Sequence, residues 1–417
     1  MNAPKSTAFA RLYRCGLAAA LAVILAGAFL WWSPGRSLAA DNSLLGGRVG
    51  TSDKQAVSGI PIRAHRDDTN ITVSVYTNSR GEYSFPAWSD LSPGSYSVAI
   101  VLPDFEPVNR QGVTLTPGNT VRLDLTLQSR QPSIADATAA EIAMAEPGTD
   151  DQRFLLTQCD NCHSLQWALR KPHTKEEWVK IVRRMAGERQ ASRDTPGTRA
   201  FGQKQYIEPL ADYLATIRGP GSSDQIPFKV RPRPAGEESA RLVVTEYDLP
   251  RGGSYEPYMI RGDRRFVWPH DVMMDSNYAW YTDHFSYRLG RLDRRTGEAK
   301  EFPYTLPPGA GREGGEGDGR AGNPGGGAHK IVFDPEKKVV FGAGGATARF
   351  DPATEQFAIW PHGNAQFGMD PAGTVWFLHG PGDLQSVDPK TGDMKNYPIS
   401  QRDGIYDMDT DSRADRF

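Results

Sequence analysis

The sequence predicts a multidomain protein in which a β-sandwich, an all-α domain and an incomplete β-propeller follow one another. Three observations lead to this fold class. Short β-like segments alternate with turns over residues 43–128, helical periodicity surrounds a Cys-x-x-Cys-His motif over 149–219, and a β-rich unit repeats from residue 240. A chain of 417 residues has room for roughly two to four domains.

Residues 1–40 have the features of an export signal. A basic start precedes an apolar run from Cys15 to Trp32, and small residues suited to cleavage follow at 37–39. The run has the minimum length for spanning a membrane. Two interpretations therefore stay open, a cleaved signal peptide or an uncleaved membrane anchor. Both predict a periplasmic or cell-surface location of bacterial type, with the membrane contacted only through an uncleaved leader.

The net charge limits the binding partners of the protein, and the cysteine content limits its disulfide bonds. The net charge of −2 gives no overall field that would attract nucleic acid, so no nucleic-acid partner is expected. Removal of the leader would also remove Cys15, leaving only Cys159 and Cys162. No structural disulfide is then available beyond that pair.

Residues 43–128 read as a β-sandwich with a turn every few residues. The segment from Val121 to Leu127 alternates apolar and polar side chains, which predicts one buried face, and Asn78 to Gly81 has the composition of a turn. The pieces Asn78-x-x-Gly81-x-Tyr83-x-Phe85 and Leu91-x-Pro93-Gly94-x-Tyr96-x-Val98, after a Gly-Arg-Val start, resemble the carboxypeptidase regulatory-like (prealbumin-like) domain. The resemblance implies a sandwich of seven or eight strands used for adhesion, spacing or protein contact, without catalysis. Residues 129–148 are predicted to be a linker that becomes helical near its end.

The Cys159-x-x-Cys162-His163 motif is the attachment signature of a c-type haem. Two thiols at this spacing can each form a thioether to the porphyrin, and His163 can then reach the iron as the proximal ligand. A chance Cys-x-x-Cys, a thiol redox pair and half of a zinc site are the alternatives. A four-cysteine zinc site is excluded because no second cysteine pair follows.

Residues 149–219 carry helical signals around this motif. Thr174 and Glu177 form a capping box, and Trp178, Ile181, Val182 and Met185 then fall on one helical stripe. A last helix is predicted to start at Pro209 and to end before Gly219-Pro220.

The segments CDNCHSL, EEWVKIVRRM and PLADYLATIRGP resemble a short bacterial class I cytochrome c. The resemblance implies one covalent haem c, a redox partner among periplasmic proteins, and Met185 as the distal iron ligand. Two alternatives stay open, that Met185 is core filler on its apolar stripe and that His173 is the distal ligand.

From residue 240 a β-rich unit repeats. Asp275, Asp334, Asp370 and Asp411 recur about 40 residues apart, except where a Gly-rich insertion at 308–327 lengthens one interval. Four short strands in each unit are typical of a propeller blade. Residues 240–417 therefore predict about three blades and the start of a fourth.

The His/Asp start, the Asp-x-x-Thr-Gly turns and the aromatic-Pro ends of these units resemble the streptogramin (virginiamycin B) lyase family. The resemblance implies a propeller that opens a cyclic depsipeptide by elimination with Mg²⁺, in a complete propeller. Too few blades are present to close one, so we expect either a truncated product or completion by another chain. We assign no catalytic role of that family to any residue of this chain. His270 and His329 occupy equivalent positions and are candidates for a metal or substrate site in the central channel; the alternative is a repeat-derived polar residue without a ligand.

The function predicted first is a periplasmic c-type cytochrome that transfers single electrons. Two alternatives remain. One is an enzyme that acts through the propeller, as a streptogramin lyase-like protein or a haem-coupled oxidoreductase. The other is a surface binding protein. No catalytic residue is identified from the sequence.

Overall fold

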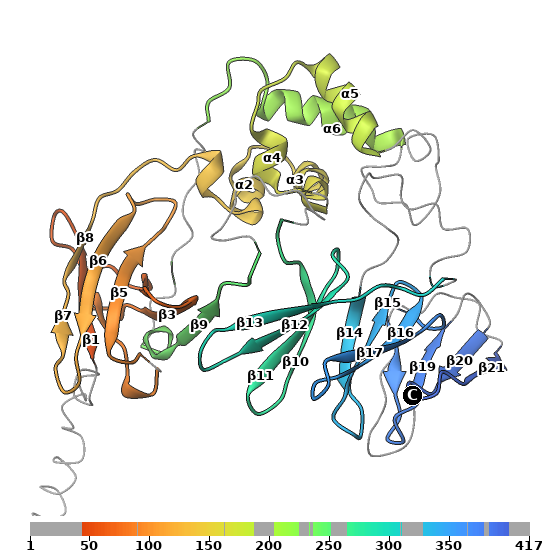
Figure 1. Cartoon of the computed structure of the whole chain (residues 1–417). Helices are drawn as coiled ribbons and strands as arrows, with labels where there is room; N and C mark the ends of the chain where they lie inside the picture. The colour runs from red at the N-terminus through yellow and green to blue at the C-terminus, as the bar shows by residue number, and fades with distance from the viewer. Residues whose placement is uncertain are drawn as a thin grey trace, which may run out of the picture.

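The computed structural model describes residues 44–186, 204–224, 237–251, 265–308 and 328–399, with gaps at 90, 162, 365 and 379–382, together with residues 233 and 310. The described chain is mostly β-sheet, with a few helices in one segment. Figure 1 shows an N-terminal pair of sheets, a helical segment beside it, and three further sheets in succession. None of the described helices combines the length and the apolar character needed to cross a membrane. The predicted leader and the predicted fourth repeat lie outside the described residues.

The N-terminal sheets form a sandwich. One sheet has the order β4-β1-β7, with β8 also pairing with β1, and the other has the order β6-β5-β2-β3-β9. The strands are β1 (Leu45–Thr51), β2 (Pro61–Arg66), β3 (Ile71–Tyr76), β4 (Glu82–Ser84), β5 (Gly94–Ile100), β6 (Val108–Leu115), β7 (Val121–Arg122), β8 (Leu125–Leu127) and β9 (Val243–Tyr247).

The sandwich core follows from the alternation in its strands. Tyr96, Val98 and Ile100 of β5 are at most 2% exposed, while the residues between them are less buried. Leu125 and Leu127 are buried in the same way, so the buried face predicted for the last strands is confirmed. One apolar cluster joins the two sheets. Because side chains alternate across a strand, each sheet contributes one face to this core.

The fifth strand of the second sheet comes from far along the chain. β9 pairs antiparallel with β3, with Val75 opposite Val243 and Ile71 opposite Tyr247. Domain limits drawn from the sequence had placed residues from 240 onward with the repeats. β9 covers the free edge of β3, and a covered edge is protected from pairing with other chains. It also lies between the sandwich and the first of the later sheets (Figure 1), where the Tyr247 hydroxyl donates to the Arg294 carbonyl at 2.6 Å.

The turn before β4 depends on Gly81. Its φ is +75°, and a Cβ at this position would lie 2.4 Å from the carbonyl oxygen of Val49 in β1. Asn78 shapes the turn, because its Oδ1 accepts hydrogen bonds from the backbone N–H groups of Arg80 and Glu82 at 2.9 Å each. The turn predicted at residues 78–81 is thus confirmed, and its last residue has no room for a side chain.

A Gly81→Ala variant is expected to lower the free energy of unfolding by about 2–4 kcal/mol, because backbone strain at positive φ adds to a clash with a fixed carbonyl. Gly118 is a matched control, since it has the same φ of +75° but no atom within 4 Å of its Cβ position. Gly118→Ala should cost about 1 kcal/mol. Amide hydrogen exchange of β1 and β4 in both variants measures the difference in local stability, and equal losses would show that the Val49 contact has no effect.

The helical segment contains η2 (Ile134–Asp136), α2 (Ala139–Ala145), α3 (Asp150–Thr157), η3 (Gln158–Asn161), α4 (Leu165–Leu169), α5 (Lys175–Ala186) and α6 (Lys204–Ile217). Four helices are preceded by a capping residue whose side chain accepts a hydrogen bond from the backbone N–H three positions later. This bond satisfies a donor that would otherwise be unpaired. The capping residues are Thr138, Thr149, Ser164 and Thr174. The capping box of Thr174 and Glu177 is confirmed in both directions.

Two segment boundaries predicted from the sequence differ from those in the structure. The linker predicted at 129–148 contributes Ile134 and Ile142 to the core of the helical segment. The last helix begins at Lys204, so its predicted start at Pro209 is wrong, and Pro209 lies inside α6. Ile207, ahead of Pro209, is 3% exposed, and its burial offsets the hydrogen bond that proline cannot donate.

Arg218, directly after α6, connects several parts of the helical segment. Its guanidinium is nearly fully buried, donates to the Leu169 carbonyl at 2.6 Å and forms an ion pair with Asp224. Its carbonyl accepts from the His173 N–H at 3.1 Å and from Trp178 Nε1 at 3.2 Å. The chain ends of α4, α5 and α6 therefore meet at this one residue.

The later part of the chain forms three antiparallel sheets, each of four strands in chain order. The first contains β10 (Pro269–Met274), β11 (Tyr278–Asp283), β12 (Arg288–Asp293) and β13 (Ala299–Pro303). The second contains β14 (Ala328–Phe333), β15 (Val339–Ala343), β16 (Ala346–Asp351) and β17 (Gln356–Trp360). The third contains β18 (Gly368–Met369), β19 (Val375–Leu378), β20 (Asp383–Val387) and β21 (Met394–Pro398).

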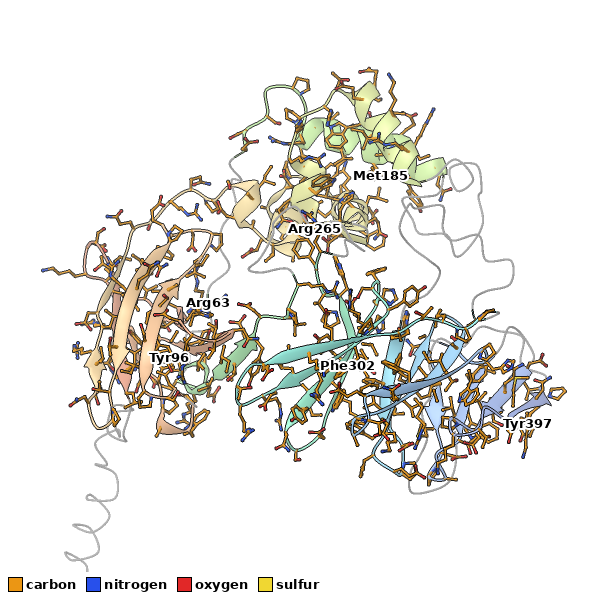
Figure 2. The ribbon with its side chains drawn as sticks, viewed as in Figure 1. Arg63, Tyr96, Met185, Arg265, Phe302 and Tyr397 are labelled. Carbon is orange, nitrogen blue, oxygen red and sulfur yellow. The ribbon has the colours of Figure 1, made fainter. Side chains whose placement is uncertain are left out.

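The three sheets pack on one another through shared apolar clusters. Trp280 and Phe302 of the first sheet pack with Phe341 and Phe350 of the second, with the Phe302 and Phe350 ring centroids 4.7 Å apart (Figure 2). A second cluster joins Val340 to the third sheet. Each repeat thus buries its apolar faces against its neighbours.

The recurring aspartates have a structural role. Asp275 accepts from the backbone N–H groups of Asn277 and Tyr278 and from Trp280 Nε1, and Asp370 likewise accepts from Trp376 Nε1 at 2.9 Å. Burial raises the pKa of Asp275, but the Trp280 indole and the backbone donors outweigh it and hold the pKa below its ordinary value. The recurring aspartates therefore close the turn between the first two strands of a sheet.

Candidate functional sites

Two groups of predicted site residues lie in different parts of the molecule. Cys159 and His163 belong to the helical segment. His270 and His329 belong to the first and second of the later sheets. The second cysteine of the motif, Cys162, lies outside the described residues.

Cys159 and His163 are held at one corner of the helical segment. Cys159 is a half-buried residue of η3, which continues directly from α3, and it packs against the core of the segment. His163 follows η3 and precedes the Ser164 cap of α4. The η3 turn therefore places Cys159 and His163 between α3 and α4.

The imidazole of His163 is oriented by its neighbour. Its Nδ1 lies 3.1 Å from the backbone carbonyl oxygen of Ser164. Because a carbonyl only accepts, Nδ1 carries the hydrogen and donates it, which leaves the lone pair on Nε2 for a ligand bond. Burial lowers the pKa of His163 and so favours the neutral ring. A half-buried thiol and an imidazole presenting Nε2 fit the attachment and the proximal coordination of haem.

The candidates for the distal ligand are on other elements. Met185 lies in the last turn of α5 and is 39% exposed, so it is not core filler, unlike Trp178 and Val182 on the same stripe (Figure 2). His173 precedes α5, with its ring in edge contact with Trp178 at 4.9 Å and its Nδ1 3.6 Å from Glu177. Met185 as distal ligand stays a prediction, and His173 already has partners in the fold.

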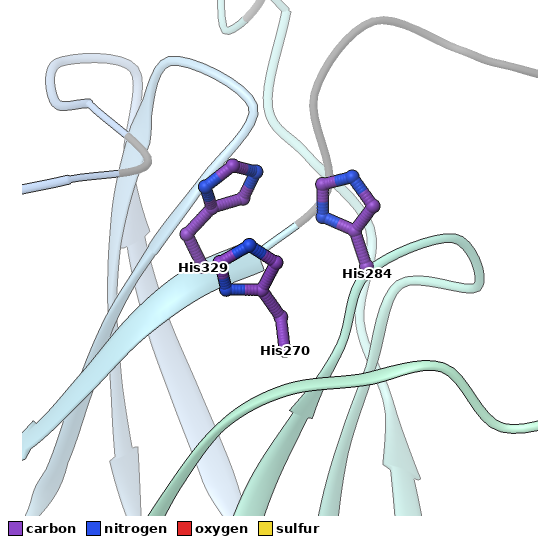
Figure 3. A group of neighbouring side chains, drawn as sticks. All are labelled: His270, His284 and His329. Atoms are coloured by element: carbon purple, nitrogen blue, oxygen red, sulfur yellow. The ribbon is translucent and has the colours of Figure 1, made fainter. Parts of the chain in front are cut away.

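His270 and His329 are brought together, and a third histidine joins them. The rings of His270 and His329 are nearly parallel, and their centroids are 3.9 Å apart. The centroid of the His284 ring lies 5.1 Å from that of His270 and 4.5 Å from that of His329. One ligand nitrogen from each residue lies within 4.8 Å of the others. Figure 3 shows the three rings converging above the ends of the strands.

The loop that carries His284 is fixed by a buried charge network. Asp283, 0% exposed, accepts from the backbone N–H of Phe285 at 3.2 Å and forms an ion pair with Arg251. Arg251 also pairs with Glu301 at 2.9 Å. Burial lowers the pKa of Arg251, but hydrogen bonds to Glu301 and Asp283 raise it more, so Arg251 stays charged.

His284 was missed in the sequence because it has no counterpart at the position shared by His270 and His329. The signal that could have found it is its place directly after the second strand of a repeat, since His379 follows β19 in the same way. His379 lies outside the described residues. Mg²⁺ prefers oxygen ligands, whereas the cluster offers imidazole nitrogens, so these three residues do not fit the Mg²⁺ that the lyase resemblance implies.

Comparison with known proteins assigns residues 45–128 to the carboxypeptidase regulatory-like domain. No curated protein matches the chain. Among solved structures, the extracellular domain of a hybrid two component system from B. thetaiotaomicron is 14% identical over 32% of this chain, with a TM-score of 0.23. A one component system domain from the same organism is 19% identical over 30% of this chain, with a TM-score of 0.21.

A cohesin–X-dockerin complex of Acetivibrio cellulolyticus is 17% identical over 22% of this chain and 62% of that one, with a TM-score of 0.18. The chain spans only 18% and 17% of the two B. thetaiotaomicron structures. These likenesses are short and concern part of the chain. The family match confirms the sandwich prediction, and residues 45–128 form a domain of the carboxypeptidase regulatory-like kind.

Proposed function

We propose that this protein is an exported c-type cytochrome that binds one haem covalently and exchanges single electrons with periplasmic proteins. The observation that carries the proposal is the oriented imidazole of His163. It follows a Cys-x-x-Cys pair directly, and the Ser164 carbonyl fixes its Nδ1 so that Nε2 is left to bind iron.

Each residue of the motif has a distinct part in the proposal. The thiols of Cys159 and Cys162 would hold the porphyrin through thioethers, and His163 would be the proximal ligand. Met185 would be the distal ligand, because its thioether is accessible at the end of α5. When bound, haem supplies one-electron chemistry; the chain sets its potential through the axial ligands, the Ser164 hydrogen bond and burial.

The rest of the chain fits a role in positioning this haem segment. In the proposal, residues 149–219 are the all-α cytochrome c domain and the three later sheets are consecutive blades of a propeller. Sheets that pack face to face through shared aromatic clusters support the blade assignment. The sandwich and the blades would serve as contact surfaces, and the protein would act in the periplasm or at the cell surface.

Full-length protein produced with a c-type haem maturation system is expected to show a reduced α-band and to keep its haem through acid-acetone extraction. A Cys159→Ala variant should keep only one thioether, and a Cys159→Ala, Cys162→Ala double variant should release all of its haem. Cys15→Ala is the matched control and should keep the haem fully. Complete haem extraction from the unmodified protein would contradict the proposal.

A further inference from the structure

We propose that His270, His284 and His329 form a binding site for one divalent transition-metal ion of the Zn²⁺ class, with one coordination position left for an exogenous ligand. The site lies in the later sheets and is independent of the haem segment. Three imidazoles from two sheets face one another within 4.8 Å (Figure 3).

The spacing of the three nitrogens is close to that of a ligand set. Nitrogens that bind Zn²⁺ at about 2.1 Å in tetrahedral geometry are about 3.4 Å apart. Metal binding therefore requires the imidazoles to turn about their side-chain torsions, from nitrogens within 4.8 Å of one another to that separation. His270 is exposed and the other two are half-buried, so an ion can enter from solvent and remain partly enclosed.

Irregular backbone places two of the three histidines. The pairing of β10 with β11 shifts register between Pro269 and Val272, and the pairing of β14 with β15 shifts between Ala328 and Ile331. His270 and His329 lie within these two equivalent shifts. A bulge redirects a side chain out of the regular pleat and is common beside functional sites. The two sheets therefore aim one imidazole each at the same space.

Hydrogen bonds between the sheets fix the two bulges relative to each other. Asp271 Oδ2 accepts from the Ile331 N–H at 3.0 Å. Thr282 Oγ1 donates to the His329 carbonyl at 3.0 Å, and the Asp271 N–H donates to Thr282 Oγ1 at 3.2 Å. The His329 and Ile331 backbones are thus held by side chains of the first of the later sheets, and one of these, Asp271, directly follows His270.

Residues outside the cluster orient the rings further. Gln366, ahead of the third sheet, has Nε2 3.1 Å from His329 Nδ1. The amide nitrogen donates here, so Nδ1 accepts and the hydrogen of the neutral ring is on Nε2. For Nε2 to bind a metal, the Gln366 amide must turn so that its Oε1 accepts a hydrogen bond from Nδ1. The His284 N–H donates to the Trp268 carbonyl at 2.9 Å, and Asp283 anchors the loop on either side through Trp268 and Phe285.

The donor type selects the ion. Neutral imidazole suits Zn²⁺, Cu²⁺ and Ni²⁺, whereas Mg²⁺ takes oxygen ligands. Three protein ligands leave a fourth tetrahedral position for water or another small donor, as in zinc sites that bind a substrate. The ligand class is therefore a Zn²⁺-like ion that carries one exchangeable oxygen or nitrogen donor.

The test uses haem-loaded full-length protein purified without a histidine tag. Zn²⁺ affinity is measured by competition with a chromophoric chelator, and the bound metal is counted after dialysis. We expect one high-affinity equivalent per chain, more than about 100-fold weaker binding in His270→Gln or His329→Gln, and about 10-fold weaker binding in Gln366→Leu. His362→Gln is the matched control, because His362 lies in the same repeats between β17 and β18, and it should bind as the unmodified protein does.

Zn²⁺ X-ray absorption gives an independent readout that does not depend on variants. Three imidazole nitrogens and one further oxygen or nitrogen donor near 2.0 Å are expected, at about the usual Zn–N distance. Fewer than three imidazoles, or an equivalent of Zn²⁺ that survives the His270→Gln, His329→Gln double variant, would overturn the proposal. Tighter binding of Mg²⁺ than of Zn²⁺ would overturn it as well. His270 is exposed, so its variant is expected to fold, and unchanged thermal unfolding checks this.

Discussion

A His163→Ala variant is expected to keep its covalently attached haem and to lose the low-spin absorbance spectrum of the unmodified protein. The thioethers depend on Cys159 and Cys162, whereas the proximal bond depends on the imidazole whose Nδ1 donates to Ser164. Loss of that ligand is expected to move the midpoint potential by on the order of 100 mV, because axial ligands are the largest control on haem potentials. Redox titration monitored by absorbance measures both changes.

Added imidazole should restore the low-spin spectrum of His163→Ala, since it can occupy the vacated position. His173→Ala is the matched control, because His173 is only ten residues further along and already contacts Trp178 and Glu177. It should leave the spectrum and the potential unchanged. A low-spin spectrum retained by His163→Ala, or lost by His173→Ala, would contradict the assignment of the iron ligands.

Local signals in the sequence predicted the strands of the sandwich and of the repeated sheets. In the repeated sheets each strand pairs with its neighbour in the chain, whereas in the sandwich β1 pairs with β4, β7 and β8 and β2 pairs with β5. β9 has the most distant partner. Its Val-Val-Thr-Glu-Tyr sequence favours a strand, but its partner β3 is more than 160 residues earlier, as the pairing of Val75 with Val243 shows. Nothing in the five residues indicates which open edge they will cover. Pairing across such a distance is set by the packing of whole domains.

The histidine cluster was half predictable for a similar reason. His270 and His329 share a position in the repeat, so repetition alone predicted that they lie together. His284 reaches the cluster from a loop held by Asp283 and Arg251. This arrangement depends on a buried ion pair between residues far apart in the chain, and the sequence pattern carries no sign of it. Met185 was predicted as the distal ligand, with core packing on its apolar stripe as the alternative. Its exposure at the end of α5 contradicts that alternative.

The Arg251→Met variant is expected to destabilise the first of the later sheets by about 3–5 kcal/mol, because it leaves the buried Asp283 without its cation, while Glu301 keeps only Arg288 at 3.7 Å. Asp283 is fully buried and Glu301 is 13% exposed, and both pair with Arg251. Amide hydrogen exchange of β11 and β12 measures the local free energy of opening, which a global transition of a multidomain chain would obscure.

Two further variants separate the lost ion pair from a general effect of removing an arginine. Arg122→Met breaks an exposed ion pair, in which the side chains of Arg122 and Asp124 are 73% and 56% exposed. This variant should change the free energy of unfolding by less than about 0.5 kcal/mol. Arg251→Met combined with Asp283→Leu should recover part of the loss, since no buried charge then remains at position 283. If Arg251→Met alone costs no more than Arg122→Met, Asp283 is not held by this pair. The position of His284 must then depend on backbone hydrogen bonds such as the one from its N–H to Trp268.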